Sequence, residues 1–179
     1  MGVQLGELVP KREIDFQQLR GKIIAVDAYN ILYQFITTIR QVDGTPLMDS
    51  NGKITSHLSG LFYRFNNLLT RGINFVFVFD GEVPKLKYGE MAEREKRKKE
   101  AEKKYEEAKR KKKVEEMQKY AKRTSRLSDV MILESKELIE AMGLCVVQAP
   151  SEGEAQAAYI AKKGDAYASA SQDFDSLLF

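Results

Sequence analysis

The stretch Ala149-Pro150-Ser151-Glu152-Gly153-Glu154-Ala155 joins an apolar run to a segment of small, helix-forming residues. The run, residues 144–147, predicts a short buried strand, and residues 155–163 predict a helix. One interpretation is structural: Ser151 and Glu154 have the spacing of a capping box, in which each side chain satisfies an orphan N–H group. The other is that Glu152 and Glu154 carry chemistry. The residues that follow the other predicted strands decide between these two interpretations.

Three other apolar runs also lead into acidic residues. Continuous apolar runs of this length are typical of strands that are buried on both faces of a parallel sheet. Segments between them have apolar residues at helical spacing, and glycines follow three of the predicted helices. Strands that alternate with helices predict an α/β fold with a mostly parallel sheet flanked by helices. Strands are expected at residues 22–27, 73–79, 144–147 and 165–171, and helices at 28–40, 56–70, 128–142 and 155–163.

Six carboxylates follow the ends of these four strands. The carboxyl ends of parallel strands meet at one edge of a sheet, where ligands bind in such folds. Each acid has a local explanation as a cap or turn residue, but their recurrence after all four strands favours a shared site. The six are Asp27, Asp80, Glu152, Glu154, Asp173 and Asp175.

Crowded carboxylates repel one another, and a divalent cation removes that repulsion. His57 is the only histidine and Cys145 the only cysteine, which argues against zinc-type ligation. Oxygen ligands suit Mg²⁺, with Mn²⁺ as a substitute. A pair of such ions can support phosphodiester hydrolysis. We expect His57 to be a helix-surface or packing residue rather than a general base, and Cys145 to be a buried thiol.

A strongly basic segment, residues 85–126, separates the second strand from the third. It holds 18 Lys and Arg against 9 Asp and Glu, a net charge of +9 that leaves the rest of the chain at −6. Residues 90–122 lack Gly and Pro and predict two helices with a break near residues 109–113. Together with the metal-binding carboxylates expected at the sheet edge, this basic segment indicates a nucleic-acid hydrolase. A solvated helix pair with no specific role is the alternative.

Other function classes find little support in the sequence. No apolar run approaches the ~18 residues of a membrane span, and no secretory signal pattern is present. We therefore expect a cytoplasmic protein with no membrane partner. The chain has neither a G-x-x-x-x-G-K-[ST] nor a G-x-G-x-x-G loop, which argues against a nucleotide-binding domain.

Several long strings resemble one family, the archaeal flap endonucleases of the structure-specific 5′ nuclease superfamily. The resemblance covers essentially the whole chain. The strings are Met1-Gly2-Val3, Ala25-Val26-Asp27-Ala28, Tyr33-Gln34-Phe35, Ser56-His57-Leu58-Ser59-Gly60-Leu61-Phe62-Tyr63-Arg64, Val78-Phe79-Asp80-Gly81, Ala149-Pro150-Ser151-Glu152-Gly153-Glu154-Ala155 and Ser171-Gln172-Asp173-Phe174-Asp175.

The resemblance implies a PIN-like 5′ nuclease core and Mg²⁺-dependent cutting of 5′-flapped DNA at the junction of single strand and duplex, with 5′–3′ exonuclease activity. It assigns the same six carboxylates to metal ions. It also makes residues 85–126 a helical arch through which the single-stranded 5′ end of the DNA passes. It puts Lys87 and Arg94 on the scissile phosphate and Tyr33 against a base. DNA contacts are further expected from Arg40, Arg64, Lys96, Arg97, Lys98 and Lys99.

The family also has parts that do not occur in residues 1–179. They are a seventh metal-site aspartate, a duplex-gripping module and a C-terminal peptide for the sliding clamp. The resemblance therefore makes residues 1–179 an N-terminal nuclease domain that is incomplete at its C-terminus. The alternative function is a non-catalytic DNA-binding fragment.

Overall fold

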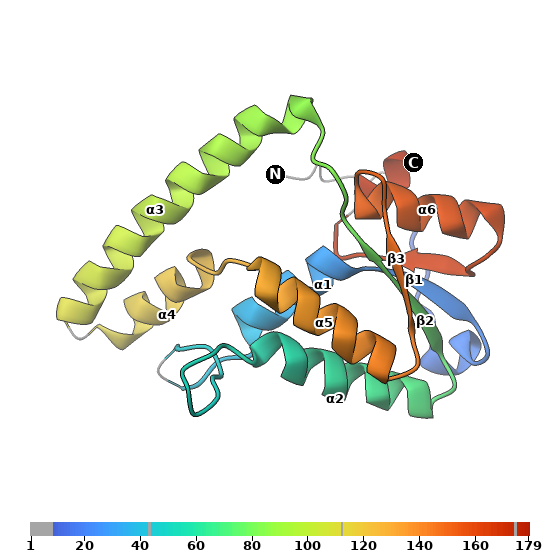
Figure 1. Ribbon diagram of the computed structural model, residues 1–179, viewed down its shortest axis with the longest axis horizontal. Coiled ribbons are helices and arrows are strands. Elements are labelled where there is room, and N and C mark those ends of the chain that lie inside the picture. The colour runs from blue at the N-terminus through green and yellow to red at the C-terminus, as the bar shows by residue number, and fades with distance from the viewer. Residues whose placement is uncertain (1–8, 43, 112, 174) are drawn as a thin grey trace.

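The structure, a computed structural model, describes residues 9–42, 44–111, 113–173 and 175–179. Four parallel strands form a single sheet in the order β3-β2-β1-β4 (Figure 1). The α/β prediction is confirmed. The strands are β1 (Ile23–Asp27), β2 (Asn74–Phe79), β3 (Cys145–Gln148) and β4 (Ala168–Ala170).

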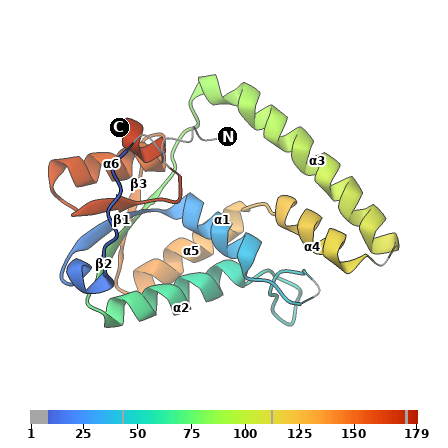
Figure 2. The same cartoon turned by 180° about the vertical axis from the view of Figure 1, so that it is seen from behind.

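Helices cover both faces of the sheet and also form an insertion that projects from it. α6 lies on one face, and α1, α2 and α5 lie on the other, as Figures 1 and 2 both show. The insertion consists of α3 and α4, which follow β2 and precede β3 in the chain, and it extends away from the sheet. The bounds are η2 (Phe16–Leu19), α1 (Ala28–Thr38), α2 (Ser56–Thr70), η3 (Lys85–Lys87), α3 (Tyr88–Arg110), α4 (Val114–Arg123), α5 (Asp129–Ala141), α6 (Gly153–Lys163) and η4 (Asp175–Leu178).

Alternating residues of the central strands build two unequal cores. Ile24, Val26 and three phenylalanines of β2 face α1, α2 and α5, where burial of each large side chain contributes about 1.5–3 kcal/mol. The opposite face carries Ala25 and Val78, which pack with Ala157 of α6. Small residues on this side let α6 approach the sheet closely. The N-terminus of α6 is thereby held beside the carboxyl ends of β1 and β2.

Some predicted features differ from the structure. α1 ends at Thr38, so Arg40 lies beyond the helix, although its Nε still donates to the carbonyl oxygen of Thr37 at 3.3 Å. β4 is shorter than the predicted strand. Cys145 is exposed rather than buried, because β3 is an edge strand with a partner only on the β2 side. His57, by contrast, is fully buried in α2, as expected of a packing residue.

The connections between the strands lie on both faces of the sheet, and they leave a crevice at one of its edges. The chain passes from β1 to β2 through α1 and α2 on one face, and from β3 to β4 through α6 on the other. Folds that reverse direction in this way bind ligands beyond the carboxyl ends of their strands. Among the helices of the described residues, none has the length and apolar composition of a membrane span.

Candidate metal and nucleic-acid site

A cavity of about 130 Å³ lies at the carboxyl edge of the sheet. Four of the six predicted carboxylates line it, contributed by the ends of β1 and β2 and by the first turn of α6. Lys87, from the base of the insertion, closes one side. The complete lining is Asp27, Asp80, Gly81, Glu82, Val83, Pro84, Lys87, Ser151, Glu152 and Glu154.

Asp27 is the most deeply placed of these acids, with 8% of its surface exposed. It ends β1 and also caps α1, since its Oδ1 accepts a hydrogen bond from the Asn30 N–H at 3.1 Å. Burial above all, together with the negative charges of Asp80 and Asp173, raises the pKa of Asp27 to about 6, against the opposing hydrogen bond from Asn30. Asp173 is therefore close enough to the cavity to act on Asp27 electrostatically.

Asp80 directly follows β2 and points toward the start of α6. Its Oδ1 accepts a hydrogen bond from the Gly153 N–H at 2.6 Å. A side chain at position 153 would place its Cβ 2.8 Å from that oxygen, so only glycine fits there. Burial raises the pKa of Asp80, while the Gly153 bond and Lys87 lower it. The carboxylate is thus held against a helix N-terminus, which favours its charged form.

The acids of the α6 turn do not form the capping box that their spacing predicts. Glu152 is the N-cap of α6 and makes no side-chain capping bond; it pairs instead with Lys87, whose Nζ lies 3.0 Å from its Oε1. The hydroxyl of Ser151 donates to the carbonyl oxygen of Glu82. Glu154 accepts a hydrogen bond from the Ser171 hydroxyl at 3.0 Å. The structural interpretation of this stretch is wrong, and both carboxylates face the cavity.

Ser171 links this turn to the end of β4. Its Oγ donates to Glu154 and accepts the N–H of Asp173 at 3.1 Å. The last predicted carboxylate, Asp175, begins η4, but its side chain lies outside what the structure describes. Five of the six acids are therefore placed in or beside one crevice.

The donor set fits a hard divalent cation. It consists of carboxylate oxygens, and the raised pKa values of Asp27 and Asp80 show that uncompensated negative charge there is costly. A bound cation would relieve that cost, as Mg²⁺ does in oxygen-only sites. In the described part of the chain, no three Asp, Glu, His or Cys side chains are yet close enough to form a ready-made metal group.

The predicted phosphate-binding cations occupy two distinct places. Lys87 lies in the cavity. Arg94 is one turn further along α3 than Glu90, to which its guanidinium donates at 2.6 Å, and it does not line the cavity. Lys96 pairs with Glu93 in the same way, at 3.2 Å.

The insertion encloses a second, basic cavity of about 400 Å³ between α3 and α4. Arg97, Lys98, Lys104 and Tyr120 line it, together with Glu100 and Ala101. Lys99 is exposed on the same helix. Lys98 also reaches the body of the protein, where its Nζ donates to the Tyr33 hydroxyl at 3.3 Å and lies 5.3 Å from the centre of its ring.

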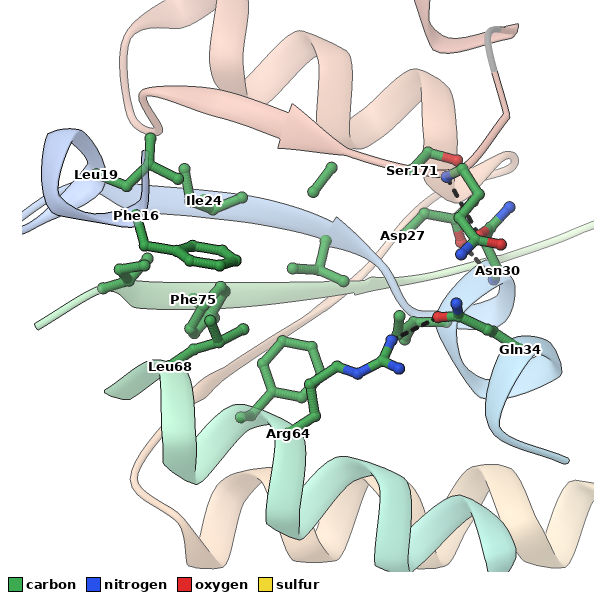
Figure 3. Close-up of a pocket in the computed structure, with 16 residues that line it drawn as sticks. Phe16, Leu19, Ile24, Asp27, Asn30, Gln34, Arg64, Leu68, Phe75 and Ser171 are labelled. Carbon is green, nitrogen blue, oxygen red and sulfur yellow. Dashed lines mark hydrogen bonds between the residues drawn. The ribbon is translucent and has the colours of Figure 1, made fainter. Parts of the chain in front are cut away.

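Arg40 and Arg64 both contact residues of α1. Arg40 is half-buried and donates to the Gly44 carbonyl oxygen and to the Ser125 hydroxyl, at the point where the insertion rejoins the body. Arg64 donates to Gln34 at 2.6 Å (Figure 3). It borders a mostly apolar cavity of about 270 Å³ that ends at Asp27 and Asn30.

Three neutral residues at the site were not singled out from the sequence. Gln148 ends β3, Ser171 follows β4, and Asn30 accepts a hydrogen bond from the Gln172 N–H at 3.3 Å. Each lies within three residues of a strand end. The rule that identified the acids would have found them had it been extended to amides and hydroxyls.

Comparisons with known proteins agree with this geometry. The model of the XPG N-terminal domain matches residues 1–101, and that of the XPG I-region matches residues 143–179. Flap endonuclease 1 of Pyrococcus furiosus is 59% identical over 179 residues, which are 100% of this chain and 53% of the relative. The chain spans about half the length of the curated relatives it matches.

Solved structures give the same result. Flap endonuclease-1 from Methanococcus jannaschii superimposes with a TM-score of 0.73 at 50% identity, over 99% of this chain and 56% of that one. The catalytic core of Rad2 in complex with DNA substrate superimposes with a TM-score of 0.61 at 29% identity, over 93% of this chain and 43% of that one.

Proposed function

This chain belongs to the XPG family, and from that membership and the carboxylate crevice we propose that it is the N-terminal nuclease domain of a 5′ flap endonuclease. The reaction is hydrolysis of a phosphodiester bond where a 5′ single strand leaves a duplex, with 5′–3′ exonuclease activity, in DNA replication and repair. The observation that carries the proposal is the convergence of Asp27, Asp80, Glu152 and Glu154 on one cavity.

The carboxylates would hold Mg²⁺, two ions in our proposal, with Mn²⁺ as a substitute. Such ions stabilise the charge that develops on the attacking and leaving oxygens. Asp27 provides buried oxygens, and Asp80, Glu152 and Glu154 provide partly buried ones. Asp173 and Asp175 complete the proposed set. Lys87 is the cation nearest this site and would contact the scissile phosphate, with Arg94 behind it.

The insertion would guide the single-stranded 5′ end. Its inner cavity is lined by cations and by Tyr120, a combination that suits a phosphate backbone with bases beside it. We propose DNA contacts for Tyr33, Arg40 and Arg64 on the body, and for Lys96, Arg97, Lys98 and Lys99 on α3. A cytoplasmic location and a sliding-clamp contact through sequence beyond residue 179 belong to the same proposal.

The alternative is that residues 1–179 bind DNA without cutting it. One observation favours it: the described acids do not form a metal group. The two functions differ in what a single carboxylate does. If the acids hold catalytic metal, Asp80→Ala abolishes cutting and leaves or improves DNA affinity, because a negative charge is removed.

The test is cleavage of a 5′-flap duplex by the chain in Mg²⁺ and in EDTA, with DNA affinity measured in EDTA. We expect metal-dependent cutting near the junction that falls at least ~10³-fold in Asp80→Ala, about 4 kcal/mol of transition-state stabilisation. Asp165→Ala is the matched control, because Asp165 forms a surface ion pair with Lys163. DNA binding without cutting in Mg²⁺ would support the alternative.

A further inference from the structure

A glutamine at the end of the edge strand holds the main chain at Asp80. Gln148 is the last residue of β3 and lies opposite Phe79 in the sheet. Its Nε2 donates to the carbonyl oxygen of Asp80 at 2.5 Å and, more weakly, to that of Phe79 at 3.4 Å. Its Oε1 accepts a hydrogen bond from Lys136 of α5 at 2.7 Å. One amide thus connects a helix, the edge strand and the end of β2.

Lys136 determines which way this amide points. An ammonium group only donates hydrogen bonds, and main-chain carbonyls only accept them. The contacts are satisfied when Oε1 faces Lys136 and Nε2 faces the carbonyls; the flipped amide would oppose donor to donor and acceptor to acceptor. Lys136 is itself held over the Phe79 ring, with its Nζ 4.9 Å from the ring centre. The orientation of Gln148 is therefore fixed by its surroundings.

The main-chain carbonyl of Asp80 depends on Gln148 for a hydrogen-bond donor more than the carbonyl of Phe79 does. The Phe79 carbonyl already accepts the Ala149 N–H at 2.8 Å. Asp80 lies one residue past β2, and the Gln148 amide is the donor that the structure gives its carbonyl. On its other side, the Asp80 carboxylate accepts the Gly153 N–H. Asp80 is thus held at its carbonyl and at its carboxylate by two different segments.

We propose that Gln148, oriented by Lys136, is a positioning residue for Asp80 and sets the affinity of the crevice for divalent cations. The inference rests on the proposed function, since it assigns Asp80 to the metal site. Residues that orient metal ligands change metal affinity by ~10–100-fold when removed. Neither Gln148 nor Lys136 lines the carboxylate cavity, so each acts through Asp80.

The experiment compares the wild-type chain with Gln148→Ala, Lys136→Met, the double variant and Lys136→Arg. Lys163→Met is the control, because Lys163 ends α6 and forms an ion pair with Asp165. Mn²⁺ and Mg²⁺ affinities are measured by calorimetry, flap-DNA affinity in EDTA, and kcat and KM for cleavage. The Gly153 amide shift in NMR spectra of the metal-free protein reports on the Asp80 carboxylate directly.

We expect Gln148→Ala to weaken Mn²⁺ binding about tenfold and to move the Gly153 amide resonance. Lys136→Met should have a smaller effect in the same direction, and the double variant should be no worse than Gln148→Ala, because the two residues act in series. Lys136→Arg, which keeps a donor, should restore most of the affinity. KM and DNA affinity should stay within twofold of wild type.

Unchanged metal affinity and an unmoved Gly153 resonance in Gln148→Ala would overturn the inference while leaving the nuclease proposal intact. A uniform loss of thermal stability with normal metal affinity would overturn it too, because that is the result of a purely structural role. If the wild-type chain binds neither metal, the proposed function fails together with this inference. In that case Asp80→Ala would match wild type in every assay, which separates the two failures.

Discussion

The Nζ of Lys87 lies 3.0 Å from Oε1 of Glu152, so the base of the helical insertion is joined by an ion pair to the first turn of α6. Lys87 immediately precedes α3, and Glu152 immediately precedes α6. The pair brings a cation to the edge of the carboxylate cavity. In the proposed function, this one lysine would have two opposing effects, because it would repel the metal ions and attract the phosphate of the substrate.

Lys87→Met should slow cleavage but strengthen metal binding. The lysine lowers the pKa of Asp80, so its positive charge disfavours a second cation beside the same carboxylates. Half of the Lys87 side chain is exposed, so we expect a gain in Mn²⁺ affinity of no more than about fivefold. Calorimetry and cleavage rates on the same preparation measure both. Weaker metal binding would show that Lys87 stabilises the site rather than competing with the metal.

Asp27→Asn should stabilise the metal-free protein, and only above the pH at which Asp27 ionises. Its pKa rises from 3.8 to about 6 on folding, so its contribution to stability is fully present below pH 3.8 and is lost as the pH rises through 6. Asparagine keeps the α1 cap without the charge. We expect a gain of about 3 kcal/mol at pH 7.5 that closes near pH 4.

Urea denaturation at four pH values between 4 and 7.5 measures this difference. Saturating Mg²⁺ at pH 7.5 should stabilise the wild type more than Asp27→Asn, because a ligand that binds only the folded state adds its binding energy to stability. A difference between the two proteins that does not change with pH would show that the charge of Asp27 is not the cause.

Neutralising α3 should weaken DNA binding and flatten its dependence on salt. The change is replacement of Lys96, Arg97, Lys98 and Lys99 by glutamine, which keeps helix propensity. Each lost contact to a single-stranded phosphate should reduce the log–log slope by ~0.7, so four contacts give up to ~2.8. Fluorescence anisotropy with a flapped duplex between 50 and 300 mM salt measures the slope. Lys162 and Lys163 on α6, neutralised in the same way, should leave it unchanged.

Lys98→Met should loosen the insertion while leaving its helices intact. Lys98 joins α3 to Tyr33 of α1, in a contact worth about 0.5–1 kcal/mol at a partly exposed position. Hydrogen exchange of the α3 amides should therefore accelerate about two- to fivefold. Lys96→Met is the control, because Lys96 pairs with Glu93 within the same helix. Equal acceleration in both variants would mean that Lys98 acts on helix propensity alone.

Gly60→Ala and Gly89→Ala should change stability in opposite directions. Both glycines lie in helices, where alanine is intrinsically favoured by about 1 kcal/mol. A Cβ at position 60 would overlap the buried Phe35 ring, whereas position 89 has no atom within 4 Å. We expect Gly60→Ala to cost about 1–3 kcal/mol and Gly89→Ala to gain up to about 1 kcal/mol. Thermal unfolding measures both, and stabilisation by Gly60→Ala would contradict the packing seen here.

The positions of Asp27 and Asp80 can be predicted from the sequence, because the last residue of a long apolar run marks the end of a buried strand. The strand-end rule needs no knowledge of which strands are neighbours. The same is true of the two helices of the insertion, whose composition allows little else. These features are local, and the structure confirms that the strands are parallel and that the first acids meet.

What could not be predicted depends on strand order. Cys145 was expected to be buried, but its exposure follows from the edge position of β3, which nothing in residues 144–147 records. Ser151 matched a capping box, yet it bonds across the crevice to Glu82 instead. The role of Gln148 likewise arises from a residue 68 positions away in the chain. Such contacts exist only once the strands have been arranged.

The order β3-β2-β1-β4 also has a consequence for how the protein is made. β1 pairs with β4, and Val26 lies opposite Ala170. The sheet therefore cannot be completed beside β1 until residue 170 has been synthesised. Pairings between residues so distant along the chain form slowly, because a long loop must close first. On the ribosome, the crevice would remain open on the β4 side until nearly all of these residues have emerged. The carboxylate crevice would therefore remain unassembled during most of the synthesis of this chain.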